Sequence, residues 1–425
     1  MTHNPNSFTI AIPTYNRGQF IHEAISSVIN QIQPSDQILI VDDGSTDNTP
    51  QILNSFANNP QIKYIVKTHT NAPHTRNIAI QEAHNPWILW LDSDDILLPN
   101  VISHYRKLLS QFPQVEVLYG NLQLFGAIQN APSSHMTFPD YYQKNEILLY
   151  HMFSQNRIPN PAVVVKKSVY QTYGPYDIHF NRLHDYQFWI RVAPYIQLKH
   201  ARRDVCRWRW HTGNMSSGSV QTDKRFNFMI VEEFLKRYPL EKIFPFFKGN
   251  NHKQSLARCY YEIGKQYVKA ALFQEAVPKA IEYLLNSISL MHSSNAYIEL
   301  EQLLSVLPFE ILNQYRSAIP SQIIEKARSV LSKANGRSFI ERYKIASLNK
   351  KVGNLERSRT CFLQLERLLS NGKKDQKALL TGVYFHLGEV YHLKSDKDKA
   401  RFYLDRCLQL NPLHQKAAQY LKQLS

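Results

Sequence analysis

Long hydrophobic runs and cysteines are scarce in this 425-residue sequence. It contains no stretch of about 18 consecutive apolar residues, so we expect no membrane-spanning helix. The first residues, MTHNPNSFTIAIP, lack the basic and then apolar pattern of a signal peptide. The cysteines are too far apart for metal-ligand spacing and are interpreted as buried apolar thiols: Cys206, Cys259, Cys361 and Cys407. These features predict a protein of the reducing cytoplasm.

Two common phosphate-binding motifs are also missing. The sequence has neither the G-x-G-x-x-G motif of dinucleotide-binding dehydrogenases nor the G-x-x-x-x-G-K-[ST] motif of P-loop ATPases. It has no recognisable nucleic-acid-binding module, and we expect no nucleic-acid partner. What it does have is 43% hydrophobic residues, enough for sizeable cores, and a length that suits two or three domains.

Charge is distributed unevenly along the chain, whose formal net charge is +16. Residues 1–230 contain 19 Lys and Arg against 16 Asp and Glu, a net of +3, whereas residues 231–425 contain 31 against 18, a net of +13. This asymmetry predicts two domains with different partners. The basic half could bind an anionic membrane surface or an acidic protein. The alternative is a solvated basic face with no partner.

Residues 8–91 alternate between strand and helix patterns. Short apolar runs at 8–12, 38–41, 62–66 and 88–91 are typical of buried strands, and segments with helical spacing separate them. This alternation predicts an α/β fold with a parallel sheet. The turns after the first, second and fourth strands should lie at one edge of that sheet, where ligands bind in such folds.

The stretch from Trp87 to Pro99, WILWLDSDDILLP, places three carboxylates at a strand end. Asp92, Asp94 and Asp95 lie within four positions of one another. Carboxylates this close repel one another unless a cation lies among them. Oxygen ligands suit Mg²⁺ or Mn²⁺, which commonly bridge a carboxylate to a diphosphate. The alternative is that this turn only caps a helix.

Four blocks resemble, in order and spacing, those of the family 2 glycosyltransferases: IPTYNRGQFIHEAISSVINQ, ILIVDDGSTDNT, HTRNIAI and WILWLDSDDILLPN. The resemblance extends from about Phe8 to Ser217, roughly half of the chain. It implies the GT-A fold, in which a Rossmann-like domain binds a nucleotide sugar and an Asp-x-Asp motif binds a metal ion.

The resemblance also implies roles for residues in these blocks. Asp92 and Asp94 would form the Asp-x-Asp pair, with Asp94 as the more direct ligand of a Mn²⁺ or Mg²⁺ cofactor. The remaining donor contacts would come from the earlier blocks, with Pro13, Tyr15 and Asp43 facing the base and Arg76 near the diphosphate.

Residues 183–191, LHDYQFWIR, resemble the segment in which the family places a Glu-Asp pair at the start of a helix. The aspartate of that pair is the general base of inverting members, and here it would be Asp185. The base must take a proton from the acceptor hydroxyl on the sugar face opposite the diphosphate. His184 stands where the family usually has Glu. The alternatives are a helix N-cap for Asp185 and a solvent-facing or hydrogen-bonded histidine for His184.

Residues 207–211, RWRWH, form a dense basic and aromatic run, and Gly213 to Ser217 follow it closely. The resemblance implies that this segment closes over the diphosphate. Arg209 would then neutralise the leaving group, and His211 would be a further metal ligand. The alternative is a sheet-edge strand with exposed Arg alternating with buried Trp.

The second half of the chain resembles tetratricopeptide repeats. Small and apolar residues have the spacing of these helix pairs at 387–412, at 263–280 and, more weakly, at 345–362, while 295–331 is degenerate. We predict that Gly388 and Ala400 are small because two helices cross closely there, with Tyr391 packed across the pair. Stacked helix pairs form a concave surface, which commonly binds a peptide or a protein.

The combined prediction is a GT-A domain at residues 1–235, a linker at 236–250 and an all-α, tetratricopeptide-like domain at 251–425. The predicted activity is transfer of a sugar, from a UDP-sugar in preference to other nucleotide donors, to a hydroxyl with inversion. The acceptor would be a glycan, a lipid-linked molecule or a protein in cell-envelope or surface glycan synthesis. Binding of anionic lipid would place the enzyme at the inner membrane face. The alternative is an inactive nucleotide-sugar-binding fold that serves as a scaffold through its repeats.

Overall fold

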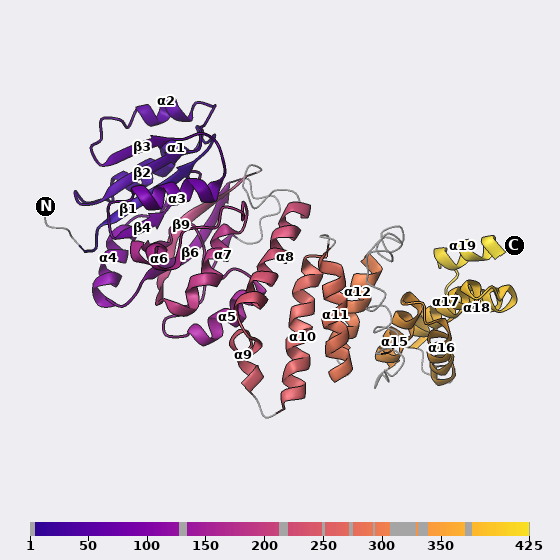
Figure 1. Cartoon of the computed structure of the whole chain (residues 1–425). Coiled ribbons are helices and arrows are strands. Elements are labelled where there is room, and N and C mark those ends of the chain that lie inside the picture. Colours follow the sequence, from indigo (N-terminus) through magenta and orange to yellow (C-terminus); the bar gives the residue numbers. More distant parts are fainter. Residues whose placement is uncertain are drawn as a thin grey trace. The chain divides into compact units, whose positions relative to one another are not determined.

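The computed structural model describes residues 5–126, 134–211, 220–248, 251–271, 275–291, 294–306, 329, 339–369 and 376–424. The chain divides into two compact units, Met1–Pro245 and Phe246–Ser425. The division falls inside the stretch 236–250 that the sequence suggests as a linker. Ile243 and Phe244, within that stretch, are fully buried. Figure 1 shows a sheet in the indigo and magenta part of the chain and helices in the orange and yellow part.

One mixed sheet forms the centre of the first unit. Its strand order is β3-β2-β1-β4-β8-β6-β9-β5, and β7 pairs with β6. The pairs β1–β2, β2–β3 and β1–β4 are parallel, which confirms the predicted parallel arrangement of the first four strands, whereas β8 is antiparallel to both of its neighbours. The bounds are β1 Phe8–Thr14, β2 Gln37–Asp42, β3 Ile62–Val66, β4 Trp87–Trp90, β5 Ile96–Leu97, β6 Val117–Gly126, β7 His135–Met136, β8 Val164–Lys166 and β9 Leu198–Trp210.

Helices follow the strands of this sheet along the chain. In the first of them the apolar residues Ile21, Ala24, Ile25 and Val28 are all buried, which is the spacing of a helix with one face against a core. The bounds are α1 Ile21–Ile29, α2 Thr49–Asn54, α3 Ala72–Glu82, α4 Val101–Gln111, α5 Asn145–Ser154, α6 Lys167–Tyr173, α7 His184–Val192, η1 Ala193–Tyr195, α8 Val220–Arg237, α9 Leu240–Ile243 and η3 Pro245–Lys248.

The strands β1, β2 and β4 lie in the core of the first unit. Ile10, Ile12, Ile40 and Leu89 have no exposed surface. Strands of a parallel sheet that is covered on both faces carry continuous apolar runs, and this is why the polar residues begin only where each strand ends. The sheet thus presents its polar turns at one edge.

The second unit consists of helices that pack in sequence, and Figure 1 shows α10, α11 and α12 side by side. A Cβ atom on Gly388 would lie 2.6 Å from Cγ of Leu404, and Tyr391 stacks on Tyr403 with ring centroids 5.5 Å apart. The predicted close crossing at Gly388 is therefore confirmed. The bounds are α10 His252–Lys269, α11 Ala276–Leu290, α12 Ser294–Val306, α15 Phe339–Lys351, α16 Leu355–Leu369, α17 Lys377–Leu393, α18 Lys397–Leu410 and α19 Gln415–Leu424.

Parts of three sequence predictions lie outside the described residues. They are the segment Gly213 to Ser217, most of the degenerate stretch 295–331, and some of the stretch 236–250.

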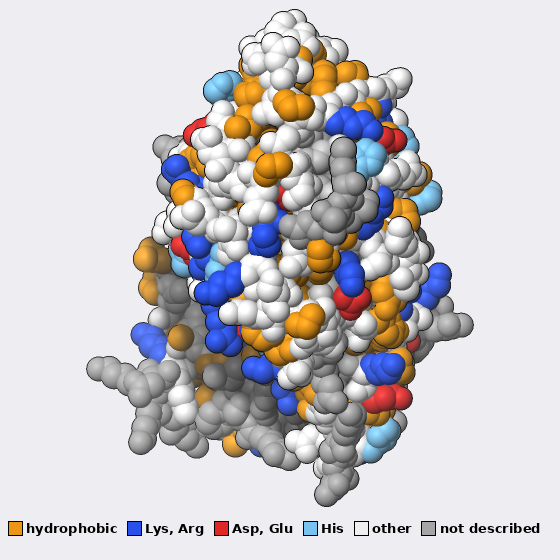
Figure 2. All heavy atoms as spheres, turned by 90° about the vertical axis from the view of Figure 1, so that its left-hand side faces the viewer, with side chains coloured by type: hydrophobic (Ala, Val, Ile, Leu, Met, Phe, Trp, Pro, Cys, Tyr) orange, Lys and Arg blue, Asp and Glu red, His pale blue; other side chains and the backbone are white. Residues whose placement is uncertain are grey.

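All four cysteines are free and buried, as expected. Among the helices of the described ranges, none combines the length and the apolar character needed to cross a membrane. Figure 2 shows one face of the molecule, on which basic side chains are interspersed with hydrophobic and uncharged ones.

Candidate active site

Three strand ends meet at one edge of the sheet. Thr14, at the end of β1, pairs with Asp42 of β2, and Ala11 pairs with Trp90 at the end of β4. A cavity of about 830 Å³ lies beyond these ends. Its lining brings together most of the residues that the sequence predicts for the site: Pro13, Tyr15, Asp43, Arg76, Asp92, Asp94 and Asp185.

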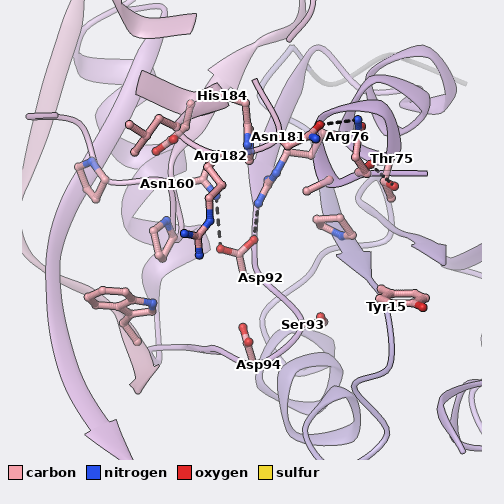
Figure 3. A pocket seen from close by; sticks show the side chains of 18 of the residues that line it. Tyr15, Thr75, Arg76, Asp92, Ser93, Asp94, Asn160, Asn181, Arg182 and His184 are labelled. Carbon is pink, nitrogen blue, oxygen red and sulfur yellow. Dashed lines mark hydrogen bonds and ion pairs between the residues drawn. The ribbon is translucent and has the colours of Figure 1, made fainter. Parts of the chain in front are cut away.

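Asp92 is held in place by two side chains from distant parts of the chain. Its Oδ1 forms an ion pair with Nη2 of Arg76, and its Oδ2 accepts a hydrogen bond of 3.3 Å from Nδ2 of Asn160 (Figure 3). The Arg76 guanidinium also lies over the Trp90 ring, 4.9 Å from its centroid. Both oxygens of Asp92 are therefore occupied by protein donors.

Asp94 faces different partners from those of Asp92. Its Oδ2 accepts a hydrogen bond of 3.2 Å from Nε of Arg17 and lies 3.0 Å from Nε2 of His211. The side chain of Asp94 is 11% exposed. The structure thus brings Asp94 and His211 into direct contact, whereas Asp92, the other predicted metal ligand of this turn, is paired with Arg76 and Asn160. Among the residues the structure describes, no group of three or more His, Cys, Asp and Glu side chains is placed to hold a metal ion.

Asp95 is the buried carboxyl group of this turn. One of its oxygens accepts the backbone N–H of Arg209 at 2.8 Å, whereas Oδ2 is buried without a hydrogen-bond partner. Burial, together with the neighbouring carboxylates of Asp94 and Asp92, raises the pKa of Asp95 well above its usual value. Retaining a proton relieves the repulsion within this cluster, and a cation nearby would relieve it equally.

Arg209 supports the acidic turn but does not line the cavity. Its Nε donates to the backbone oxygen of Asp94 at 2.8 Å, and its Nη2 forms an ion pair with Glu23. The guanidinium lies between two aromatic rings, 4.7 Å from the centroid of Phe20 and 4.3 Å from that of Phe125. The run 207–210 belongs to β9, and of these four residues Arg207 alone pairs with β5. All four are partly buried, so the alternation of exposed Arg with buried Trp that the alternative interpretation assumed is not present.

A second acidic turn follows β2 and contains Asp43. Residues that the sequence interpretation missed complete this turn. Asp43 forms an ion pair with Lys67, accepts the backbone N–H of Thr70 at 2.9 Å, and has Oδ2 3.0 Å from Nδ1 of His69. The ring of His69 stacks on Tyr15, with centroids 4.1 Å apart. Lys67, His69 and Thr70 follow the third predicted strand. Their position at the carboxyl end of a parallel strand is the signal that could have identified them.

Asp185 lies near the start of α7, on the part of the lining contributed by a later segment. The N-cap position is Leu183, whose φ of +56° is left-handed, so Asp185 is the second residue of the helix and not its cap. Its Oδ2 accepts a hydrogen bond of 3.0 Å from Nδ2 of Asn156. Burial, reinforced by the Asp92 carboxylate, raises the pKa of Asp185 above its usual value. A carboxylate with a raised pKa is a better proton acceptor.

His184 is neither solvent-facing nor hydrogen-bonded in the structure. Its residue surface is 7% exposed, and neither ring nitrogen has a hydrogen-bond partner. The ring packs edge-on against Tyr176, with centroids 5.5 Å apart, and it also lines the cavity. Both alternatives suggested by the sequence are therefore wrong for this residue.

Comparisons with known proteins match two parts of the chain. The family model described as Glycosyl transferase family 2 matches residues 9–152, and the one described as Tetratricopeptide repeat matches residues 381–412. The first region contains β1 to β4 and both acidic turns, whereas Asp185 and His211 lie beyond it. The second contains most of α17 and all of α18.

Several relatives are similar to a part of the chain. An uncharacterized glycosyltransferase of Rickettsia prowazekii is 24% identical over 248 residues, which cover 58% of this chain and 76% of that protein. The chondroitin synthase of Pasteurella multocida is 23% identical over 232 residues, 54% of this chain and 23% of that protein. A PGL/p-HBAD biosynthesis glycosyltransferase of Mycobacterium bovis is 24% identical over 238 residues, 55% of this chain and 84% of that protein.

Among solved structures, TarS 1-349 of S. aureus in complex with UDP-GlcNAc aligns with a TM-score of 0.47 and 16% identity, covering 84% of this chain and 90% of that one. The glycosyltransferase relatives agree with the first family match, and the second family match identifies the repeat. The chain therefore carries a glycosyltransferase family 2 domain at residues 9–152 and a tetratricopeptide repeat at residues 381–412.

Proposed function

We propose that the first unit transfers a sugar from a nucleotide donor, preferably a UDP-sugar, to an acceptor hydroxyl with inversion. One observation carries this proposal. A single cavity beyond the strand ends is lined by the carboxylates of Asp92 and Asp94 and by the partly buried carboxylate of Asp185. The matched family and the glycosyltransferase relatives support the reaction class.

The base of the nucleotide is proposed to bind at the second acidic turn, where Pro13, Tyr15 and Asp43 line the cavity. The stacked rings of Tyr15 and His69 offer an aromatic surface on which a base can stack. Because Asp43 already accepts hydrogen bonds from its neighbours, we assign it the role of fixing the 67–70 turn around this surface. The donor's diphosphate would then extend toward the carboxylates after β4.

A divalent metal ion is proposed to bind at that point. Asp94 and His211 supply an oxygen and a nitrogen within 3.0 Å of each other, and the adjacent Asp95 has a buried oxygen without a donor. We propose that Asp94 and His211, with Asp92 nearby, hold Mn²⁺ or Mg²⁺ with the diphosphate. When bound, the ion would neutralise the negative charge of the leaving group. Arg209 is proposed to support Asp94 through its backbone.

Asp185 is proposed to act as the general base. Its carboxylate would take the proton of the acceptor hydroxyl while that oxygen bonds to the anomeric carbon and the bond to the diphosphate breaks on the opposite face. Asn156 orients the carboxylate through its hydrogen bond to Oδ2. The names of the chondroitin synthase and PGL/p-HBAD biosynthesis relatives favour an acceptor that is a glycan or a lipid-linked molecule, in synthesis of a surface or cell-envelope glycan.

Binding of the donor can be tested by thermal unfolding of the full chain. A ligand that binds only the folded protein at about 100 times its Kd stabilises it by about 2.7 kcal/mol. UDP with Mn²⁺ should therefore raise the melting temperature, UDP with a chelator should raise it less, and uridine should have little effect. If no nucleoside diphosphate shifts the melting temperature with either Mn²⁺ or Mg²⁺, the catalytic proposal is contradicted and the scaffold alternative is favoured.

A further inference from the structure

One wall of the cavity carries buried polar atoms that have no hydrogen-bond partner. They are Nδ1 and Nε2 of His184, Nε and Nη1 of Arg76, and Oδ1 of Asn160. His184 as a residue is 7% exposed and Arg76 is 4% exposed. All three residues line the cavity, and in Figure 3 the side chains of Arg76 and Asn160 reach Asp92, with His184 drawn farther from it. Buried polar atoms are paired in most folded proteins. Their concentration on one wall indicates that a ligand supplies the missing partners.

The chemistry of these atoms defines the ligand. The guanidinium nitrogens of Arg76 only donate hydrogen bonds, and Oδ1 of Asn160 only accepts them. A neutral imidazole donates from one nitrogen and accepts at the other, and burial together with the Arg76 guanidinium lowers the pKa of His184 to about 3. A phosphate group at neutral pH offers mainly acceptors and would leave Asn160 and one nitrogen of His184 unpaired. A hydroxyl group both donates and accepts, so a ring with several hydroxyls matches this wall.

We infer that His184 is a specificity-determining residue that reads the hydroxyl groups of the donor sugar, together with Arg76 and Asn160. The inference rests on the proposed function and adds the residue that would distinguish one sugar from another. Arg76 and Asn160 both bind Asp92, which is separated by one residue from Asp94, so the wall adjoins the proposed diphosphate site. A sugar attached to that diphosphate would reach it.

Packing alone does not account for His184. Its edge contact with Tyr176 would be made equally well by a phenylalanine, which has no nitrogens to leave unpaired. An unpaired buried polar group costs about 1–3 kcal/mol, so the histidine carries a cost that a ligand would remove. The left-handed backbone of Leu183, which a branched side chain rarely adopts, immediately precedes it. Such strain is tolerated where the surrounding structure fixes the position of a functional residue.

The test compares the full-length wild type with His184→Phe and His184→Gln by titration calorimetry in Mn²⁺. The probes are UDP, UDP-glucose, UDP-galactose and UDP-N-acetylglucosamine. We expect His184→Phe to bind UDP like the wild type, to bind the preferred UDP-sugar about three- to tenfold more weakly, and to discriminate less between sugars. His184→Gln, which restores a donor and an acceptor, should recover part of the loss. His179→Phe is the matched control, because the His179 side chain is 82% exposed and does not line the cavity.

The outcomes separate this inference from the function on which it rests. If His184→Phe weakens UDP and the UDP-sugars equally, or changes neither, His184 does not read the sugar, while the proposed donor site stands. If the wild type binds none of the probes, both proposals fail. Should His184→Phe unfold at a lower temperature than the assay requires, His184→Leu takes its place, because an unchanged sugar preference in that apolar variant would also contradict the inference.

Discussion

At the scale of single residues, the site contains two carboxylates that differ in their hydrogen bonding. Both oxygens of Asp92 are paired, with Arg76 and Asn160, whereas Asp185 accepts a hydrogen bond from Asn156 on Oδ2 and has a raised pKa. A paired carboxylate positions its neighbours, and a less paired one remains able to accept a proton. The two aspartates are thus suited to different tasks although both line one cavity.

The Asp185→Asn variant should keep donor affinity and lose turnover by about 10²–10⁴-fold, the usual contribution of a positioned general base. Titration with the donor measures affinity, and product formation measures turnover. Because the base must be ionised and burial raises its pKa, the wild-type rate should fall as the pH drops, beginning above the ordinary aspartate value of 3.8. Donor affinity that collapses along with turnover would instead make Asp185 a donor contact or a structural residue.

At the scale of secondary-structure elements, the close crossing of α17 and α18 depends on Gly388. A Cβ atom there would lie 2.6 Å from Cγ of Leu404 and 3.4 Å from the backbone oxygen of Ala400. Gly388→Ala should therefore lower the free energy of unfolding of the second unit by about 1–3 kcal/mol, although alanine is the better helix former. Chemical denaturation monitored by circular dichroism measures the change.

The matched control for that variant is Lys416→Ala on the exposed face of α19, which should change the free energy of unfolding by less than about 0.5 kcal/mol. Donor binding should be unaffected by either substitution, since the donor site lies in the first unit. A Gly388→Ala protein as stable as the wild type would show that the two helices can separate without cost, contrary to the packing described here.

Strands with a continuous apolar run could be predicted from the sequence, whereas a strand whose apolar run is interrupted could not. The apolar runs of β1 to β4 were identified because buried parallel strands are apolar throughout. Strand β6 was missed because Gly120 and Asn121 interrupt it like a turn. In the structure, β6 and β9 shift register at these residues, and a Cβ atom on Gly120 would lie 2.5 Å from Cγ1 of Val205. Glycine is needed there for a close approach at an irregular pairing.

The same limit applies to the site. The acidic turns were predictable because they directly follow recognisable strands. Asn156 and Asn160 were not, because they come from a loop more than 60 residues away from Asp92 in the sequence, and only the folded chain shows that they bind Asp185 and Asp92. Residues that act through side-chain partners distant in sequence carry no local pattern from which a single sequence can identify them.

At the scale of the whole molecule, the chain combines a nearly neutral half with a basic one. The net charge of +13 over residues 231–425 exceeds what solubility requires of a helical domain of this size. We propose that this half binds an anionic surface, either a membrane leaflet or an acidic protein. The tetratricopeptide match at residues 381–412 is compatible with a binding role, because repeats of this kind present extended surfaces.

Co-sedimentation of the full chain with vesicles tests the membrane version of this proposal. Binding to vesicles that contain anionic lipid should exceed binding to neutral vesicles at 0.1 M salt and should disappear near 1 M, since the Debye length falls from about 10 Å to about 3 Å. Equal binding to both vesicle types, or binding to neither, would rule out the membrane and leave an acidic protein or a solvated face.

We propose, above all, that this cavity catalyses glycosyl transfer. The most direct measurement is the release of nucleoside diphosphate when the full chain is incubated with single nucleotide sugars in Mn²⁺ or Mg²⁺, with the Asp94→Asn variant as a matched control. We predict that the wild type releases nucleoside diphosphate from at least one nucleotide sugar, and most from a UDP-sugar. The Asp94→Asn variant should lose this release, although its melting temperature without ligand should stay near that of the wild type. No release from any nucleotide sugar, or undiminished release by Asp94→Asn at saturating Mn²⁺, would contradict the account.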